Sequence, residues 1–428
     1  MDVIHERVAG IDISKSDIKV CVRIPAPAGK KNTRAFSHEV RTFPTTHSGL
    51  TAAAEWVGSA GVSVVAMEST GQYWKPVFYT FEALLGTAGV KVWLVNPFHI
   101  KKVPGRKSDV TDAVWIAQVT ACGLINPSFV PDPITRQARM LSRAREGLVV
   151  DRTRVKQRIH DLLTEAGFRL SSVATDIFGI SGRAMLAAVI NGEADPVALA
   201  GLARGKLAAK TDGLIEAMTT FAGAFDETTR FLLKTQLERL DAITADIAKI
   251  DAQLEVVQAP FRCTIARVIT LPGAGVISVR AVLAETGADM AAFESAEALC
   301  SWAGVCPGNT QSGDRRGNGA TRPGNPHLKR ALHQIAEAAV RVKDSYYQGL
   351  YQRLKARMDR EKALMVIMHK ILTAIWHMVR REQEFNPTQV QARPMDAKAK
   401  ARAAQRLTKK LEGLGFHVAL TDAEAQAA

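Results

Sequence analysis

Several features that define common protein classes are missing from this sequence. Its 428 residues include only five cysteines, which form neither a CxxC pair nor a Cys/His ligand spacing. That pattern predicts neither a zinc site nor a disulfide framework, and it suits a reducing cytosol. The sequence also lacks any run of about 18 apolar residues, and its N-terminus lacks the charged and then apolar layout of a signal peptide. We therefore expect a cytoplasmic protein with no membrane partner.

Acidic residues are fewer than basic ones. The 42 Asp and Glu residues face 56 Lys and Arg residues, which gives a net charge of +14. Such an excess favours a polyanionic partner, nucleic acid before membrane, but it does not distinguish DNA from RNA. The hydrophobic content of 47% suffices for two or three domains with cores of their own, because one core rarely grows past about 250–300 residues.

The first third of the chain predicts an α/β domain. Short alternating apolar runs indicate a hairpin and a third strand, and two further strands alternate with helical stretches. The expected strands are 8–14, 17–23, 35–43, 62–67 and 90–95, and the expected helices are 47–58 and 74–85. The order βββαβαβ, followed by a helix, predicts a sheet covered on both faces. This layout resembles the RNase H-like, RuvC-type nuclease fold.

Four acids fall where such a sheet would gather them. Asp12 lies within the first strand, Glu68 ends the fourth, and Asp109 and Asp112 lie in RKSDVTDAVWIAQ. Their spacing of three puts the last two on one face of a helix. Carboxylate clusters of this kind hold Mg²⁺ through hard oxygen ligands. Two such ions about 4 Å apart would clamp the attacking and leaving oxygens of a phosphodiester.

Each acid also has a simpler explanation. An unpaired carboxylate inside an apolar strand is costly, so packing alone explains Asp12 poorly. Asp109 by itself is also typical of an acid that stabilises a helix N-terminus. Lys107 belongs to a basic group just before the pair, which is either a solvated face or a contact with a nucleic-acid backbone. The other members of that group are Lys101, Lys102 and Arg106.

The middle of the chain predicts long helices. A helix over 136–166 carries a dense basic surface that includes Arg143 and Arg152, and we interpret this surface as one that follows phosphates. Residues 167–225 predict short helices and loops. From Leu237 to Val257 apolar residues recur at gaps of three and four, which predicts a coiled-coil seam ended by Pro260. The seam pairs either with the 136–166 helix or with another subunit.

The last third contains a serine-bearing loop between helices. Residues 269–283 predict either a helix-hairpin-helix turn that binds phosphate or a plain interhelical turn. A helix over 295–303 leads to QSGDRRGNGATRPGNPHLKR, in which Ser312 lies among glycines and arginines. Asn325 and Pro326 predict the start of the next helix. The apolar stretch 361–381 predicts a core helix, and the basic tail predicts a helix through Leu411.

Six motifs in order resemble the DEDD transposases of bacterial insertion sequences, in the family numbered one hundred and ten. They are GIDISK, AMESTGQYW, RKSDVTDAVWIAQ, LPGAGVISVRAVLAETG, WAGVCPGNTQSG and GNPHLKRAL. The resemblance implies a RuvC-like domain, which we place at 1–130, and a C-terminal transposase domain, which we place at 259–385. It leaves the middle and the tail unmatched, and the residues there predict a helical or coiled-coil linker over 131–258 and a basic tail over 386–428. It also implies a nucleoid-associated bacterial protein.

The resemblance also implies a mechanism. Asp12, Glu68, Asp109 and Asp112 match the metal-binding acids, for Mg²⁺ or Mn²⁺, and Ser312 matches the nucleophilic serine. The family is implied to recombine donor and target DNA under the guidance of a structured bridge RNA, as a homo-oligomer, either dimer or tetramer, with composite sites between protomers. Arg315 and Arg316 are placed to offset charge on the phosphate or to anchor the backbone. Lys329 and Arg330 extend the expected nucleic-acid contacts.

Three rival functions stay open. A RuvC-like enzyme would cut DNA junctions with water and use Ser312 only structurally. An actin-like kinase or ATPase also opens with a GID-type strand, but it needs a second glycine-rich phosphate-binding turn that this sequence lacks. A non-enzymatic RNA-binding scaffold would need only the basic helices.

Overall fold

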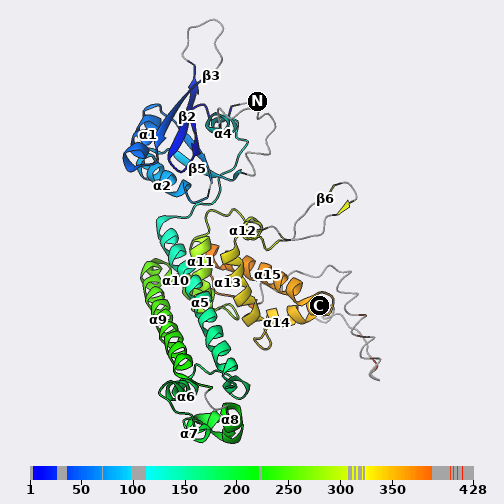
Figure 1. The fold of residues 1–428 in the computed structure, drawn as a ribbon. Helices are drawn as coiled ribbons and strands as arrows, with labels where there is room; N and C mark the ends of the chain where they lie inside the picture. The colour runs from blue at the N-terminus through cyan, green and yellow to red at the C-terminus, as the bar shows by residue number, and fades with distance from the viewer. Residues whose placement is uncertain are drawn as a thin grey trace. The chain divides into compact units, whose positions relative to one another are not determined.

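The computed structural model divides the chain into two compact units, Met1–Val130 and Pro131–Ala428. Each unit is described here by itself (Figure 1). The described residues are 3–26, 36–69, 71–97, 112–220, 224–306, 311–312, 315–316, 321, 323–387, 405, 408, 412 and 417. The finer division of the second unit into linker, transposase domain and tail stays a prediction.

The first unit contains a five-stranded mixed sheet in the order β3-β2-β1-β4-β5. The strands are β1 (Val8–Ile13), β2 (Asp17–Pro25), β3 (Phe36–Pro44), β4 (Val64–Glu68) and β5 (Lys91–Val95). β1 and β2 pair antiparallel, as do β2 and β3, whereas β1 with β4 and β4 with β5 pair parallel. The predicted α/β layout with an N-terminal hairpin is confirmed.

Helices cover both faces of this sheet (Figure 1). On one face, α1 (His47–Ser59) and α2 (Trp74–Leu85) bury apolar side chains against alternate residues of β1, including Ile11. On the other face, α4 (Asp112–Ala121) packs against Val8, Cys21 and Val64. A short helix, η1 (Gly86–Ala88), connects α2 to β5. Because side chains alternate along a strand, each residue of β1 is assigned to one of these faces.

The residues of the second unit that the structure describes form mainly helices, together with one short strand pair (Figure 1). Its two longest helices, α5 (Pro133–Glu165) and α9 (Glu227–Val257), pack side by side in the same chain. Short helices lie between them in sequence, as predicted for residues 167–225. They are η3 (Leu170–Ser172), α6 (Ile180–Ile190), α7 (Pro196–Ala200), η4 (Gly205–Lys210) and α8 (Thr211–Met218).

The predicted apolar repeat of α9 faces the inside of this chain. Leu237, Leu240, Ile243 and Ile247 join a core that also includes side chains of α5, α6, α7 and α8. Burial along α9 then skips to Leu254. Since the buried positions share one core with several helices rather than with a single partner helix, the coiled-coil detail is not confirmed. The structure does confirm that α9 packs against α5 within one chain.

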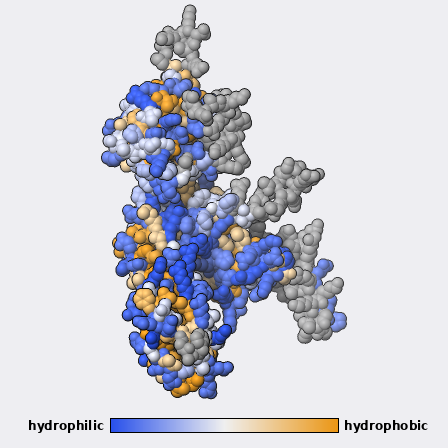
Figure 2. Space-filling view, in the orientation of Figure 1, coloured by the Kyte–Doolittle hydropathy of each residue, from blue (hydrophilic) through white to orange (hydrophobic). Residues whose placement is uncertain are grey.

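Hydrophobic side chains are exposed on this part of the second unit. Ile180 is 77% exposed, Phe231 65% and Val197 60%. Figure 2 shows hydrophobic surface over the helices at the end of the α5 and α9 pair where α6 and α7 lie. The core beneath remains continuous, because Met185, Leu186 and Leu199 are buried there.

Four of the remaining helices pack around α15 (Arg360–Arg380). They are α10 (Arg262–Ile269), α12 (Ala296–Ala303), α13 (Pro326–Ala339) and α14 (Tyr346–Lys355). Helix α11 (Val276–Thr286) packs against α5, α10 and α13, and the short helix η5 (Ala259–Phe261) contacts α9 and α10. By length and composition α15 is apolar enough to cross a membrane, with a mean hydropathy of 1.3 over its most apolar window. Half of that window is buried inside the unit, which agrees with the predicted core helix.

Several predicted boundaries in the second unit are confirmed. Ser295 caps α12, and Asn325 caps α13 with Pro326 in its first turn. The turn between α10 and α11 includes Gly273 at φ +82°, where an added Cβ would lie 2.3 Å from the Ala339 nitrogen. Close packing against α13 therefore explains this glycine, and phosphate binding by the turn stays a prediction. Most of the predicted tail helix lies outside the described residues.

Candidate active site

Asp12 lies on the α4 face of the sheet. Along β1, Ala9, Ile11 and Ile13 face α1 and α2, whereas Val8 faces α4. Alternation therefore directs Asp12 toward α4. Burial raises the pKa of the Asp12 carboxyl above its usual value, and the negative charge of Asp112 raises it further. The structure thus brings Asp12 and Asp112, one hundred residues apart in sequence, into electrostatic contact.

Glu68 ends β4 beside Asp12. β1 and β4 run parallel, with Ile11 opposite Met67, so the next step of the register puts Asp12 next to Glu68. In β4, Val65 and Met67 contribute to the core on the α1 and α2 side, and Glu68 therefore follows Val64 toward α4. Both predicted strand acids project from the same face of the sheet.

Close packing of α4 on β1 positions Asp112. A Cβ on Gly10 would lie 2.3 Å from the carbonyl oxygen of Ala113 and 2.4 Å from the nitrogen of Ala117. Only a residue without a side chain allows the helix backbone to come this near. Asp112 is the first residue of α4, so the contact at Gly10 sets the distance between the helix start and Asp12.

The described residues contain only part of the predicted acid set. Asp109 and the basic group that includes Lys107 fall in 98–111, outside the described residues. The predicted shared helix face of Asp109 and Asp112 is therefore not tested. Within the described part of the chain, no three His, Cys, Asp or Glu side chains are grouped as a metal site.

The backbone around Ser312 forms a small hairpin in the second unit. β6 (Gln311–Ser312) pairs antiparallel with β7 (Arg315–Arg316), and Ser312 lies opposite Arg315. The description of these four residues is limited to their backbone. This hairpin lies between α12 and α13 in the sequence, and the roles of Ser312, Arg315 and Arg316 stay predictions.

Three arginines on the predicted basic face of α5 have acidic partners within the second unit. Arg143 contacts Glu285 through two parallel hydrogen bonds of 2.8 and 2.9 Å. Arg139 contacts the same carboxylate at 3.2 Å, and Arg145 contacts Asp251. The sequence did not predict these partners, which are 106 to 146 residues away. Nucleic-acid binding by Arg143 stays a prediction, but its guanidinium already neutralises a buried charge.

The other predicted basic contacts have varied surroundings. Arg330 forms an ion pair with Glu146, and burial lowers the pKa of the Lys329 ammonium below its usual value. Arg152 is half-buried on α5. Glu146 also accepts a contact from His327 at 2.5 Å. Burial, together with the positive charge of Arg143, lowers the pKa of His327.

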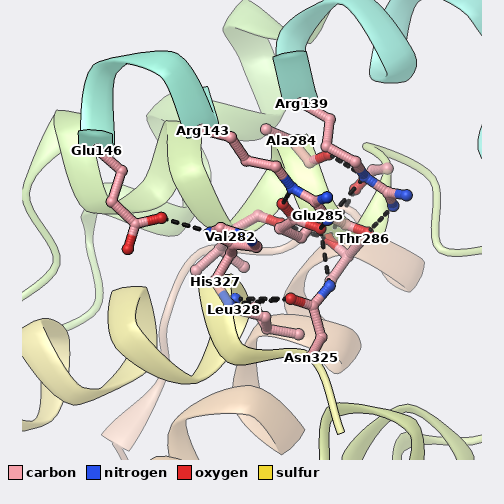
Figure 3. Close-up of polar contacts among 11 residues, drawn as sticks. Arg139, Arg143, Glu146, Val282, Ala284, Glu285, Thr286, Asn325, His327 and Leu328 are labelled. Carbon is pink, nitrogen blue, oxygen red and sulfur yellow. Dashed lines mark hydrogen bonds and ion pairs between the residues drawn. The ribbon is translucent and has the colours of Figure 1, made fainter. Parts of the chain in front are cut away.

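A polar cluster at the start of α13 was missed by sequence reasoning. Glu285 of α11 is 1% exposed, and it accepts a 2.7 Å hydrogen bond from Nδ2 of Asn325 as well as the contacts from Arg139 and Arg143. Figure 3 shows these side chains converging from α5, α11 and the N-terminus of α13. The available signal was a single acid in the mostly apolar stretch VISVRAVLAETG.

Two transposase family models match this chain. A model of the DEDD transposase domain of IS110 matches residues 9–168. A model described as "Transposase IS116/IS110/IS902 family" matches residues 265–352. The first match covers the sheet with Asp12, Glu68 and Asp112, and the second covers Ser312, Glu285 and Asn325.

Curated relatives carry insertion-element names. The chain is 29% identical over 328 residues to the "Insertion element IS900 uncharacterized 42 kDa protein" of Mycobacterium paratuberculosis, covering 71% of this chain and 80% of that protein. It is 26% identical over 321 residues to the "Insertion element IS110 uncharacterized 43.6 kDa protein" of Streptomyces coelicolor, covering 68% and 76%.

Solved RuvC structures are also similar to part of the chain. Thermus thermophilus RuvC matches at 17% identity with a TM-score of 0.21, covering 28% of this chain and 99% of RuvC. The same protein in complex with a Holliday junction substrate matches at 17% identity with a TM-score of 0.22, covering 29% and 100%.

The two family matches, in chain order, define the class of this protein: it is a transposase of the kind that insertion elements encode. More particularly, the chain belongs to the IS110 family of DEDD transposases.

Proposed function

We propose that this transposase cuts and rejoins donor and target DNA through a covalent bond to Ser312, assisted by metal held at Asp12, Glu68, Asp109 and Asp112. The observation that carries the proposal is the proximity of Asp12 and Asp112, where burial and like charge together raise the pKa of the Asp12 carboxyl. A protein retains such an unfavourable arrangement most readily at a functional site.

The acids present fit a divalent cation. A cation between Asp12 and Asp112 would offset both their mutual repulsion and the cost of burial, and carboxylate oxygens are the ligands that Mg²⁺ prefers. Glu68, on the same face of the sheet, would supply a further oxygen. When bound, Mg²⁺ or Mn²⁺ would stabilise charge on the attacking and leaving oxygens of the phosphodiester.

Ser312 would perform the covalent step. Its Oγ loses a proton and bonds to phosphorus, while the bond from phosphorus to the leaving deoxyribose oxygen breaks and that oxygen takes up a proton. The phosphoserine conserves the phosphodiester energy, so a hydroxyl of another strand can attack it, release the serine and complete the exchange. Arg315 and Arg316 would offset charge on the phosphate.

The proposal extends to partners and assembly. The net charge of +14 supports polyanionic ligands, and we include a structured bridge RNA that pairs with donor and target DNA. The predicted acids belong to the first unit and Ser312 to the second. The two units, from one chain or from two chains of a homo-oligomer, must therefore act on the same DNA.

A covalent protein–DNA adduct tests this function. Purified protein is incubated with labelled donor DNA, Mg²⁺ and the RNA transcribed from the non-coding DNA beside its gene, and the products are separated under denaturing conditions. We expect an adduct and joined DNA with the wild-type protein, and neither with Ser312→Ala. Ser301→Ala, on the exposed side of α12, is the matched control and should retain both.

The rival functions give different results in this assay. DNA cleavage without an adduct, retained in Ser312→Ala, would establish a nuclease that uses water. RNA binding with no DNA cleavage by the wild-type protein would favour the scaffold. Either result contradicts the proposed serine chemistry.

A further inference from the structure

The described residues that flank the Ser312 segment on its two sides meet at one place. The segment begins after α12, whose C-cap is Gly304 in the left-handed conformation, and it ends at Asn325, the N-cap of α13. A Cβ on Gly324 would lie 2.3 Å from the carbonyl oxygen of Ala303 and 2.6 Å from Cα of Gly304. The two ends of the segment are thus packed backbone against backbone.

The two packed ends form the base of the Ser312 segment. Asn325 connects this base to the interior of the unit. Its Oδ1 accepts hydrogen bonds from the backbone nitrogens of His327 and Leu328, at 3.0 and 3.2 Å, which caps α13. Its Nδ2 donates to Glu285 at 2.7 Å. The orientation of the amide follows from chemistry, because a backbone N–H can only donate and a carboxylate can only accept.

Glu285 is in turn held by α5. Arg143 binds both of its carboxylate oxygens, and Arg139 contacts one of them. Arg139 also donates to the backbone carbonyls of Ala284 and Glu285, at 3.3 and 2.7 Å. Paired, charge-assisted hydrogen bonds of this kind fix direction as well as distance. The cluster therefore links the longest helix of the unit to the residue at which the Ser312 segment ends (Figure 3).

We propose that Glu285 and Asn325 are positioning residues for Ser312, which they orient by fixing the base of its segment to α5 and α11. This inference rests on the proposed function of Ser312 as the nucleophile. Helix capping alone does not explain the cluster, because an aspartate at 325 would cap α13 equally well but could not donate to Glu285.

A swap of the hydrogen-bonding pair tests the inference. Asn325→Asp keeps the cap but places two carboxylates together, whereas the double variant Glu285→Gln with Asn325→Asp restores one hydrogen bond with its direction reversed and conserves the total charge. The rate of the Ser312–DNA adduct is measured at saturating donor DNA, with the bridge RNA and Mg²⁺ present. The KM for DNA and the thermal midpoint are measured in parallel.

We expect Asn325→Asp to slow adduct formation about tenfold or more at saturating DNA, since small displacements of a reacting group are costly, with KM unchanged. The double variant should recover most of that loss. Ser345→Asp, which introduces a carboxylate at the N-cap of α14 in the same unit, is the control and should react at the wild-type rate.

Three results would overturn the inference. One is an Asn325→Asp protein that forms the adduct at the wild-type rate. The second is a double variant that remains slow, and the third is a loss of rate that only follows the fraction of unfolded protein. The last two indicate a purely structural cluster. Ser312→Ala separates this failure from that of the proposed function: if this variant still forms an adduct, the serine chemistry itself is wrong.

Discussion

Gly10 has no side chain at the point where α4 comes nearest to β1. The two atoms nearest to an added Cβ, the Ala113 oxygen and the Ala117 nitrogen, belong to the helix backbone. A rotamer change cannot relieve such a contact, so the whole helix would have to move. Asp112 begins that helix, and its charge acts on Asp12. A methyl group at Gly10 would therefore separate two of the proposed metal ligands.

Gly10→Ala should destabilise the first unit by about 1–3 kcal/mol, as overpacking of a close contact does, and should weaken Mg²⁺-dependent DNA cleavage further than the loss of folded protein explains. Chemical denaturation and the cleavage rate under folding conditions measure the two effects. Gly147→Ala is the matched control, because that glycine lies within α5 with no atom within 4 Å of its added Cβ. It should stabilise the helical unit by up to about 1 kcal/mol. Equal effects of the two substitutions would contradict this account.

Residues whose environment is local in sequence were predictable, and those held by distant partners were not. Asp12 and Glu68 stand out because one carboxylate interrupts an apolar strand and the other ends one. Asn325 was expected as a cap, since Pro326 follows it. Its second bond, to Glu285, spans 40 residues, and the bond from Arg143 to Glu285 spans 142. Neither separation leaves a periodic signal in the sequence.

The α9 helix shows what one repeat of apolar residues can specify. Its buried face predicted a long helix and its end, and α9 does end at Val257, just before Pro260. The same face did not reveal its partner, because Leu237 and Leu240 fit equally well against α5 or against another subunit. In the structure they contact α5 and the short helices between the two, and the pattern of those short helices was too weak to predict that shared core.

Leu240→Ala should therefore lower the free energy of unfolding of the helical unit by about 2–5 kcal/mol, the usual range for a buried leucine, without changing the molar mass of the native protein. Leu240 is 2% exposed. Denaturant titration and light scattering measure the two quantities. Phe231→Ala, near the start of α9 and 65% exposed, should have little effect on stability. A lower molar mass for Leu240→Ala would instead place this face at a contact between subunits.

For the whole molecule, the number of basic residues overstates the free positive surface. Of the arginines on α5, Arg139, Arg143 and Arg145 each neutralise an acid of α9 or α11. Arg330 likewise pairs with Glu146. These contacts use positive charge to hold helices together, and composition alone does not distinguish this use from binding to phosphate. Neighbouring cations also lower the pKa of histidines in the helical unit.

Ionisable groups with shifted pKa values predict that the two units respond differently to pH. Burial lowers the pKa of His327, His369 and His377, and neighbouring cations lower each further. The unfolded chain thus binds protons more tightly than the native helical unit. These histidines therefore do not reduce the stability of that unit above the ordinary histidine pKa, and they reduce it progressively as pH falls below about 6.5. Asp12 acts in the opposite sense, because its pKa is raised and the native first unit gains stability as pH falls.

Hydrogen exchange, corrected for the intrinsic pH dependence, can follow the units separately. Between about pH 7.5 and 5.5, peptides from α15 should lose protection, whereas peptides from β1 should not. The variant with both His369→Gln and His377→Gln should show a weaker loss in α15, because neither replacement takes up a proton. At about pH 8, where the native histidines are neutral, this variant and the wild type differ only by packing, which provides the reference. Protection of α15 that stays constant or rises on acidification would show that these histidines do not control the acid stability of the helical unit.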